Sequence, residues 1–182
     1  MVDQFIRDGI NHREDEYGGS IDNRLRFMME IVNAVCMEIG SGKVGIRLSP
    51  SNKVWGIKDS NPQAIFSRAV ILLNKFNLAY VHILEPKPET GHAMAASDYL
   101  TPVLRENYQG SLIINGGYNK KTANNALANN EAEAIAFGTP FIANPDLVER
   151  FQTDAALTQP DRTTFYTSEA KGYTDYAFMD GV

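Results

Sequence analysis

The amino-acid sequence predicts an α/β fold in which parallel strands are covered by helices. Short apolar segments alternate with longer segments whose apolar residues recur at helical spacing. The short segments are apolar throughout rather than alternating, as expected for strands buried on both faces of a parallel sheet. We expect four such strands, at residues 44–48, 79–84, 112–114 and 134–137.

The helices are predicted from their start and stop signals. The first 19 residues are rich in turn chemistry and are expected to form a loop. Ser20 is an expected N-cap of a helix that Gly40 ends, and Asn61-Pro62 marks a second helix start. Apolar spacing in the first helix covers Leu25, Met28, Val32, Val35, Cys36 and Ile39. Later helices are expected to open at Ser97 or Asp98, to cover residues 119–129, and to open at Asn144-Pro145-Asp146.

The order of these elements favours half of a TIM-type (β/α) barrel over an open sheet. The first strand ends in Arg47-Leu48-Ser49-Pro50 rather than in a G-x-G-x-x-G loop. Glycines instead follow the last two strands, where barrels build phosphate sites. A closed barrel needs eight βα units, typically about 250 residues. We therefore expect a single partial barrel domain over residues 1–182, with βα units in 1–152 and a carboxy-terminal tail in 153–182.

Composition narrows the classes of function. The 182 residues include 22 acidic and 17 basic side chains without a basic run, which argues against nucleic-acid binding and against binding to an anionic membrane. A single cysteine, Cys36, excludes an internal disulfide and is expected to be a buried thiol. No signal peptide or membrane-spanning stretch is evident, so a cytoplasmic protein is expected.

Two glycine loops are candidates for binding an anion. Asn115-Gly116-Gly117-Tyr118 and Phe137-Gly138-Thr139 each follow a predicted strand and precede a helix. Glycine allows backbone N–H groups to approach a phosphate closely, and the following helix adds its positive end. Either loop alone is more often a tight turn, whereas two in successive units favour a phosphate site.

Three polar residues mark the expected strands and their ends. Arg47 points either toward a ligand or into an internal salt bridge, for example with Glu85, and the sequence leaves both open. His82 is interpreted as a satisfied core residue. His12 and His92 are expected to be solvated, and Tyr166, Tyr173 and Tyr176 to dock the tail. No metal-ligand spacing and no nucleophile motif is present, so no metal is expected.

Taken together, these segments resemble the Old Yellow Enzyme family of NAD(P)H:flavin oxidoreductases. The resemblance runs in order through nearly the whole chain. It rests on residues 3–9, 17–20, 23–27, 44–50, 115–118, 136–147, 164–166 and 172–176.

The resemblance implies a (β/α)8 barrel that holds FMN, takes hydride from NADH or NADPH, and reduces activated carbon–carbon double bonds. It places Arg47 beside the flavin pyrimidine edge and Tyr166 on the substrate side. The implied phosphate loops comprise Asn115, Gly116, Gly117, Phe137, Gly138 and Thr139.

Two departures from the family pattern matter. Thr139 stands where many members carry a phosphate-binding arginine. The family's His-x-x-Asn pair and tyrosine would lie just upstream of Asp3, so no catalytic residue is assigned. We expect strands five to eight of the barrel, a truncated form inactive alone. Alternatives are one half of a split enzyme with an amino-terminal partner, a non-catalytic FMN or phosphate-binding module such as a homodimer, and a remnant without function.

Overall fold

The computed structural model describes residues 1–51, 56–86, 99–167 and 169–179. The chain forms two compact units, Met1–Ile135 and Ala136–Val182, and each is described by itself. The expectation of one domain over the whole chain stays a prediction.

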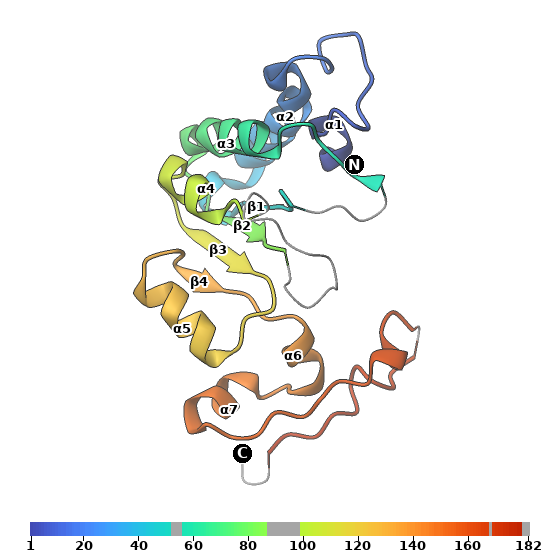
Figure 1. Cartoon of the computed structure of the whole chain (residues 1–182), viewed down its shortest axis with the longest axis vertical. Helices are drawn as coiled ribbons and strands as arrows, with labels where there is room; N and C mark the ends of the chain where they lie inside the picture. Colours follow the sequence, from blue (N-terminus) through green and yellow to red (C-terminus); the bar gives the residue numbers. More distant parts are fainter. Residues whose placement is uncertain (52–55, 87–98, 168, 180–182) are drawn as a thin grey trace. The chain divides into compact units, whose positions relative to one another are not determined.

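The first unit contains a four-stranded parallel sheet (Figure 1). Its strands β1 (Gly45–Leu48), β2 (Tyr80–Leu84), β3 (Leu112–Asn115) and β4 (Ala134–Ile135) pair in chain order. This confirms the predicted α/β fold with parallel strands. β4 is two residues shorter than predicted, and the Phe137 ring beyond it instead packs on Phe151, with ring centroids 5.0 Å apart.

Three helices of the first unit begin at the predicted positions, each behind a capping side chain. The Ser20 side chain accepts from the Asn23 N–H at the start of α2 (Ile21–Ile39), and Asn61 accepts from the Ala64 N–H at the start of α3 (Pro62–Leu73). A reciprocal capping box of Asn119 and Thr122 opens α5 (Lys120–Ala128). These side chains satisfy backbone donors that a helix start leaves unpaired.

Other helix boundaries differ from the sequence prediction. The first 19 residues are not all loop, because α1 (Val2–Ile6) forms there. α4 (Thr101–Asn107) has proline in its first turn, and the predicted starts Ser97 and Asp98 lie outside the described residues. In the second unit the short α6 (Thr139–Ala143) precedes α7 (Leu147–Thr153), which follows Asp146 as expected. Single 3-10 turns lie at Ser41–Lys43, Asn74–Phe76 and Arg162–Thr164.

The hydrophobic core lies between the helices and one face of the sheet. Strand residues Leu48, Val81, Ile83, Leu112 and Ile114 are all buried there. Their helical partners include Leu25, Met28, Ile65, Phe66, Ala69, Leu73 and Leu104. Figure 1 shows α3, α4 and α5 following one another along one side of the strands.

The second half of α2 is more exposed than its apolar spacing predicts. Val35 and Ile39 are 39% and 47% exposed, and Cys36 is half-buried rather than buried. α2 has 19 residues and α3 has 12. At 1.5 Å per residue α2 is therefore about 10 Å longer than the helix it packs against. The apolar spacing of α2 therefore continues beyond the part of the helix that α3 covers.

A buried arginine fastens α1 to the loop that follows β1. The Arg7 guanidinium is 1% exposed and donates to the carbonyl oxygens of Pro50 at 3.0 Å and Ser49 at 2.5 Å. It also stacks 4.7 Å from the centre of the Phe66 ring. This contact fixes the chain immediately after the strand that carries Arg47.

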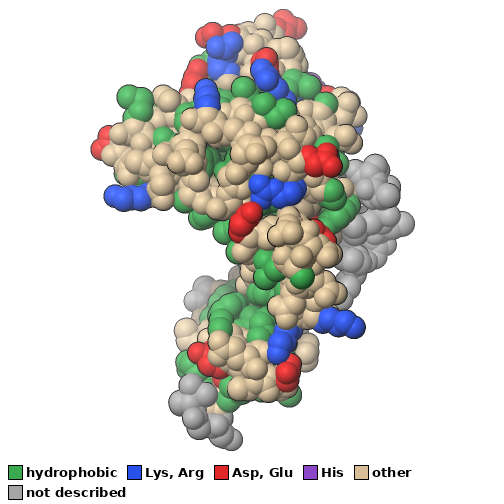
Figure 2. All heavy atoms as spheres, turned by 90° about the vertical axis from the view of Figure 1, so that its left-hand side faces the viewer, with side chains coloured by type: hydrophobic (Ala, Val, Ile, Leu, Met, Phe, Trp, Pro, Cys, Tyr) green, Lys and Arg blue, Asp and Glu red, His purple; other side chains and the backbone are tan. Residues whose placement is uncertain are grey.

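Charged side chains do not gather into one patch on the face that Figure 2 shows. Lysine and arginine are scattered there among acidic and apolar side chains. Among the described residues, no helix is both long and apolar enough to cross a membrane.

Candidate functional site

The face of the sheet opposite the core carries a polar row. Arg47 pairs in register with His82, and Leu84 pairs with Asn115. Residues paired in register in a parallel sheet project from the same face, and alternate residues share a face. Arg47, His82 and Asn115 therefore lie together on the face that the helices do not cover, and the structure brings these residues of β1, β2 and β3 together.

Arg47 is exposed and makes no ion pair with any described residue. Glu85, the alternative partner considered above, is engaged by Thr101 and Tyr118 instead. A salt bridge between Arg47 and Glu85 is therefore wrong. A guanidinium that no described anion neutralises is available to an external one.

His82 is not a core residue, and that prediction is corrected. It is half-buried on the uncovered face, and its Nε2 lies 3.0 Å from Asn115 Oδ1. Burial and the nearby Arg47 charge lower the pKa of His82, so the neutral ring is favoured. Because Asn115 Oδ1 can only accept, the neutral ring carries its proton on Nε2. The bond fixes the Asn115 side chain at the end of β3.

The local structure accounts for both glycines of the first glycine loop, Gly116 and Gly117. A Cβ on Gly116 would lie 2.8 Å from Glu85 Cβ and 3.1 Å from the Glu85 carbonyl oxygen. Gly117 has φ +82°, a left-handed conformation that glycine adopts without steric cost. The tight turn alone thus accounts for the glycines, and phosphate binding by this loop stays a prediction.

A buried glutamate lies directly beside this loop. Glu85 is 6% exposed, and its carboxylate accepts hydrogen bonds from the Thr101 hydroxyl and, at 2.5 Å, from the Tyr118 hydroxyl. Burial raises the pKa of Glu85 above its ordinary value, opposed by these hydroxyl donors. Sequence reasoning singled out Glu85 but missed these contacts, because a pairing between residues 33 positions apart leaves no local signal.

The second glycine loop belongs to the second unit. Gly138 precedes the five-residue α6, and Thr139 is the first residue of that helix. A Cβ on Gly138 would meet nothing within 4 Å. Neither its φ of −103° nor a close neighbour demands glycine here, so the space beside this backbone is open.

Tyr166 is presented to solvent by a strained backbone. Its residue is 97% exposed and has φ +62°, while its N–H donates to the Tyr173 hydroxyl at 2.6 Å. The Tyr176 hydroxyl accepts from the Asp161 N–H. Tyr173 and Tyr176 therefore join parts of the tail to one another, whereas the ring of Tyr166 is left uncovered, and docking of the tail stays a prediction. His12 is exposed, and His92 lies outside the described residues.

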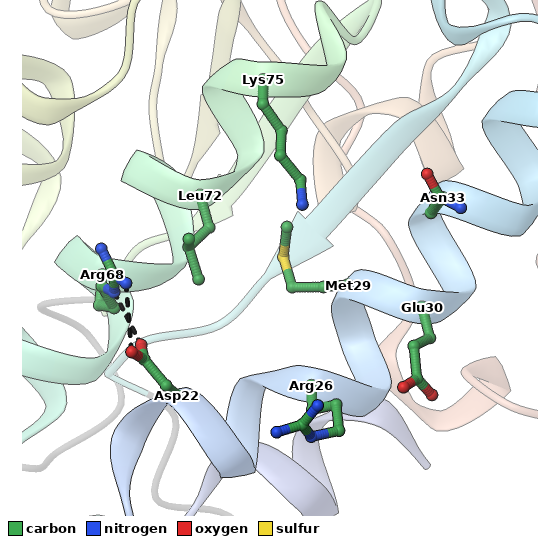
Figure 3. Close-up of a pocket in the computed structure, with 8 residues that line it drawn as sticks. All are labelled: Asp22, Arg26, Met29, Glu30, Asn33, Arg68, Leu72 and Lys75. Atoms are coloured by element: carbon green, nitrogen blue, oxygen red, sulfur yellow. Dashed lines mark hydrogen bonds and ion pairs between the residues drawn. The ribbon is translucent and has the colours of Figure 1, made fainter.

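An open groove between α2 and α3 is a weaker candidate (Figure 3). Met29 and Leu72 form its apolar part. Arg68 is paired with Asp22 at 2.8 Å, and Glu30 accepts from the Tyr17 hydroxyl. The groove is built from outer helices and its charges are largely engaged, so we place the candidate site at the strand ends.

Comparison with known proteins identifies the family. Residues 1–158 match the NADH:flavin oxidoreductase / NADH oxidase family. The chain belongs to this family. It is 43% identical to 12-oxophytodienoate reductase 2 of Arabidopsis thaliana over 181 residues, covering 99% of this chain and 48% of the relative. Putative 12-oxophytodienoate reductase 11 of Oryza sativa subsp. japonica is 44% identical, covering 98% and 49%.

Solved structures of the family share the fold. Morphinone reductase superposes with a TM-score of 0.93 at 43% identity, covering 99% of this chain and 48% of that protein. The old yellow enzyme homologue of Zymomonas mobilis gives 0.93 at 38% identity, covering 98% and 50%. Another solved structure shows morphinone reductase in complex with tetrahydroNAD. The expected resemblance to the Old Yellow Enzyme family is confirmed, and this chain spans about half the length of these relatives.

Proposed function

We propose that this chain forms part of an FMN-dependent NAD(P)H oxidoreductase of the ene-reductase type. The observation that carries the proposal is Arg47, an exposed guanidinium on the uncovered sheet face beside the neutral pair of His82 and Asn115. When bound, FMN supplies the hydride relay between NADH or NADPH and an activated carbon–carbon double bond. A fixed cation beside the flavin pyrimidine edge stabilises negative charge that develops there.

The residues of this chain fit such a group. Arg47 would hold the pyrimidine edge, because no described anion already neutralises it. Asn115, Gly116 and Gly117 would bind phosphate through a loop with one left-handed residue, a conformation that turns successive N–H groups inward. We also assign Phe137, Gly138 and Thr139, in the second unit, to phosphate binding. Tyr166 would line the substrate side with its uncovered ring.

We propose that the chain is inactive by itself. Its 182 residues contain neither the His-x-x-Asn nor the His-x-x-His pair of the family, so no residue here is assigned to proton transfer. The uncovered sheet face favours a second candidate, one half of a split enzyme that an amino-terminal polypeptide completes. A non-catalytic FMN-binding homodimer would cover the same face with a second copy.

An FMN titration tests the proposal. The ¹⁵N-labelled chain is titrated with FMN while the amide resonances of residues 45–48 and 115–118 are followed. We expect weak, saturable shifts at both segments, and Arg47→Ala should weaken binding by about tenfold, the loss of one charge-assisted contact. Arg13→Ala, which removes another exposed arginine, is the control. Shifts confined to the groove of Figure 3, or an Arg47→Ala chain that binds FMN as well as the wild type, would contradict the proposal.

A complementation experiment separates the alternatives. The chain is co-expressed with the amino-terminal half of 12-oxophytodienoate reductase 2, the relative that shares 43% of its aligned residues. NADPH oxidation that depends on both polypeptides and on an added enone supports the split-enzyme arrangement. Stoichiometric flavin on the chain alone, without activity, supports the binding module.

A further inference from the structure

Glu85 makes three different contacts with one short loop. Its N–H donates to the Asn115 carbonyl oxygen at 2.8 Å. Its Cβ and carbonyl oxygen leave space for Gly116 but for no larger residue. Its carboxylate accepts from the Tyr118 hydroxyl at 2.5 Å. Glu85, directly after β2, therefore contacts the loop in three ways: through a backbone hydrogen bond, through close packing against Gly116, and through a side-chain hydrogen bond.

The carboxylate is held from its other side as well. The Thr101 hydroxyl at the start of α4 donates to Oε1, while Tyr118 donates to Oε2. Burial, followed by the hydrogen bond to Glu85 and its charge, raises the pKa of Tyr118, so this phenol stays protonated and remains a donor. Both carboxylate oxygens are therefore satisfied, and the glutamate is a fixed anchor.

We propose that Glu85 is a positioning residue for the loop Asn115–Tyr118 and, through Tyr118, sets the loop's affinity for the phosphate of the flavin. The inference rests on the proposed function. Glu85 itself does not contact the phosphate. It keeps the loop N–H groups in one arrangement, so that binding an anion does not have to order a glycine pair that is otherwise free to move.

The chemistry of the anchor predicts which substitutions matter. Tyr118→Phe removes the hydroxyl that donates to Glu85 Oε2. Glu85→Ala removes both acceptors. Glu85→Gln keeps the shape, since its carbonyl accepts from one hydroxyl and its NH₂ donates to the oxygen of the other. Glu85→Gln should therefore keep the loop as fixed as in the wild type, whereas Glu85→Ala should not.

The first measurement needs no ligand. Hydrogen exchange of the amides of residues 116–119 is compared in the wild-type chain, Tyr118→Phe, Glu85→Ala and Glu85→Gln. We expect exchange to be about tenfold faster in Tyr118→Phe, which loses one hydrogen bond to the carboxylate, at least as fast in Glu85→Ala, which loses two, and at the wild-type rate in Glu85→Gln. Tyr17→Phe is the matched control, because it also removes a hydroxyl that donates to a glutamate, Glu30, away from this loop.

The second measurement compares FMN with riboflavin, which lacks the phosphate, in titrations of the same variants. Tyr118→Phe should lower FMN affinity by about tenfold and leave riboflavin affinity unchanged. Loop exchange and FMN affinity that both match the wild type in Tyr118→Phe would overturn the inference, and so would equal losses for FMN and riboflavin. If Glu85→Ala does not fold, Tyr118→Phe decides alone.

The two proposals fail differently. A wild-type chain that binds FMN no better than riboflavin overturns the proposed phosphate site. With faster loop exchange in Tyr118→Phe, that result would keep Glu85 as an anchor of the loop and remove its link to the cofactor. Selective FMN binding by the wild type with an unaltered Tyr118→Phe variant would keep the proposed function and discard the anchor.

Discussion

Removing the Arg7 guanidinium should destabilise the first unit strongly. Arg7 donates to the carbonyl oxygens of Pro50, in a buried contact, and Ser49, in a part-buried one, and stacks on Phe66. A buried carbonyl left without a donor costs about 1–3 kcal/mol, and the desolvated ring contact adds about 1–2 kcal/mol. Because water can reach the part-buried Ser49 carbonyl, only the Pro50 carbonyl and the ring contact are counted, and we expect Arg7→Ala to cost about 2–5 kcal/mol.

Urea unfolding followed by far-ultraviolet circular dichroism measures this loss. A domain of ordinary stability unfolds with about 5–15 kcal/mol, so the transition midpoint should fall far while its slope stays unchanged. Arg7→Lys should recover only part of the loss, because an ammonium cannot donate in the planar fork that serves two carbonyls. Arg13→Ala removes an exposed partner of Asp15 and should leave the midpoint nearly unchanged. An Arg7→Ala variant within about 1 kcal/mol of the wild type would refute the reasoning.

Four further outcomes are expected. The folded-state pKa of Glu85 lies above its ordinary 4.5 because of burial, so the stability this group contributes is fully present below that pH and is lost as the pH rises through the folded pKa. Unfolding free energies measured across this range should therefore shift in favour of Glu85→Gln as the pH rises, and a constant difference would contradict the buried carboxyl. Asn61→Ala should cost about 1 kcal/mol in the same assay through loss of the α3 cap, and a neutral result would show the cap to be dispensable. The purified chain should carry little flavin by visible absorbance, because Thr139 offers the phosphate no charge and the uncovered sheet face offers the flavin ring only one wall. A stoichiometric flavin spectrum would argue for the binding module. Sedimentation at micromolar concentration should show dimers or aggregates, whereas a cooperatively unfolding monomer would mean that the chain covers its own core.

Local signals in the sequence were sufficient for the sheet and most helix starts. Ser20 is the predicted cap, and Asn61 and Asn119 cap helices that begin where they were predicted, since a cap needs nothing beyond three or four neighbouring residues. The strand order followed from the alternation of apolar strands and helices. Local reasoning failed at α1, whose five residues precede the turn signals and end at Arg7, which donates to the distant Ser49 and Pro50 carbonyls.

Only some features of the candidate site could be predicted from the sequence. Arg47 stood out as a cation among apolar strand residues, and its place on the uncovered face follows from strand pairing. His82 was assigned to the wrong face, because an apolar strand without alternation gives no indication of which side is covered. The contacts of Glu85 with Gly116 and Tyr118 join residues more than 30 positions apart, so no spacing rule could have found them.

The sheet face that carries the candidate site is also the face that the described helices of the first unit leave uncovered. Arg47 is exposed there, and His82, Leu84, Ile113 and Asn115 are only partly buried. Whatever covers this face, a second copy or an amino-terminal polypeptide, would supply the opposite wall of a flavin site and lower the local dielectric around Arg47. Binding of the covering polypeptide and binding of flavin are then thermodynamically linked, so each must raise the affinity for the other by the same factor. A half-barrel that binds flavin weakly when alone is the expected consequence of this coupling, and it does not by itself count against the residues that line the site.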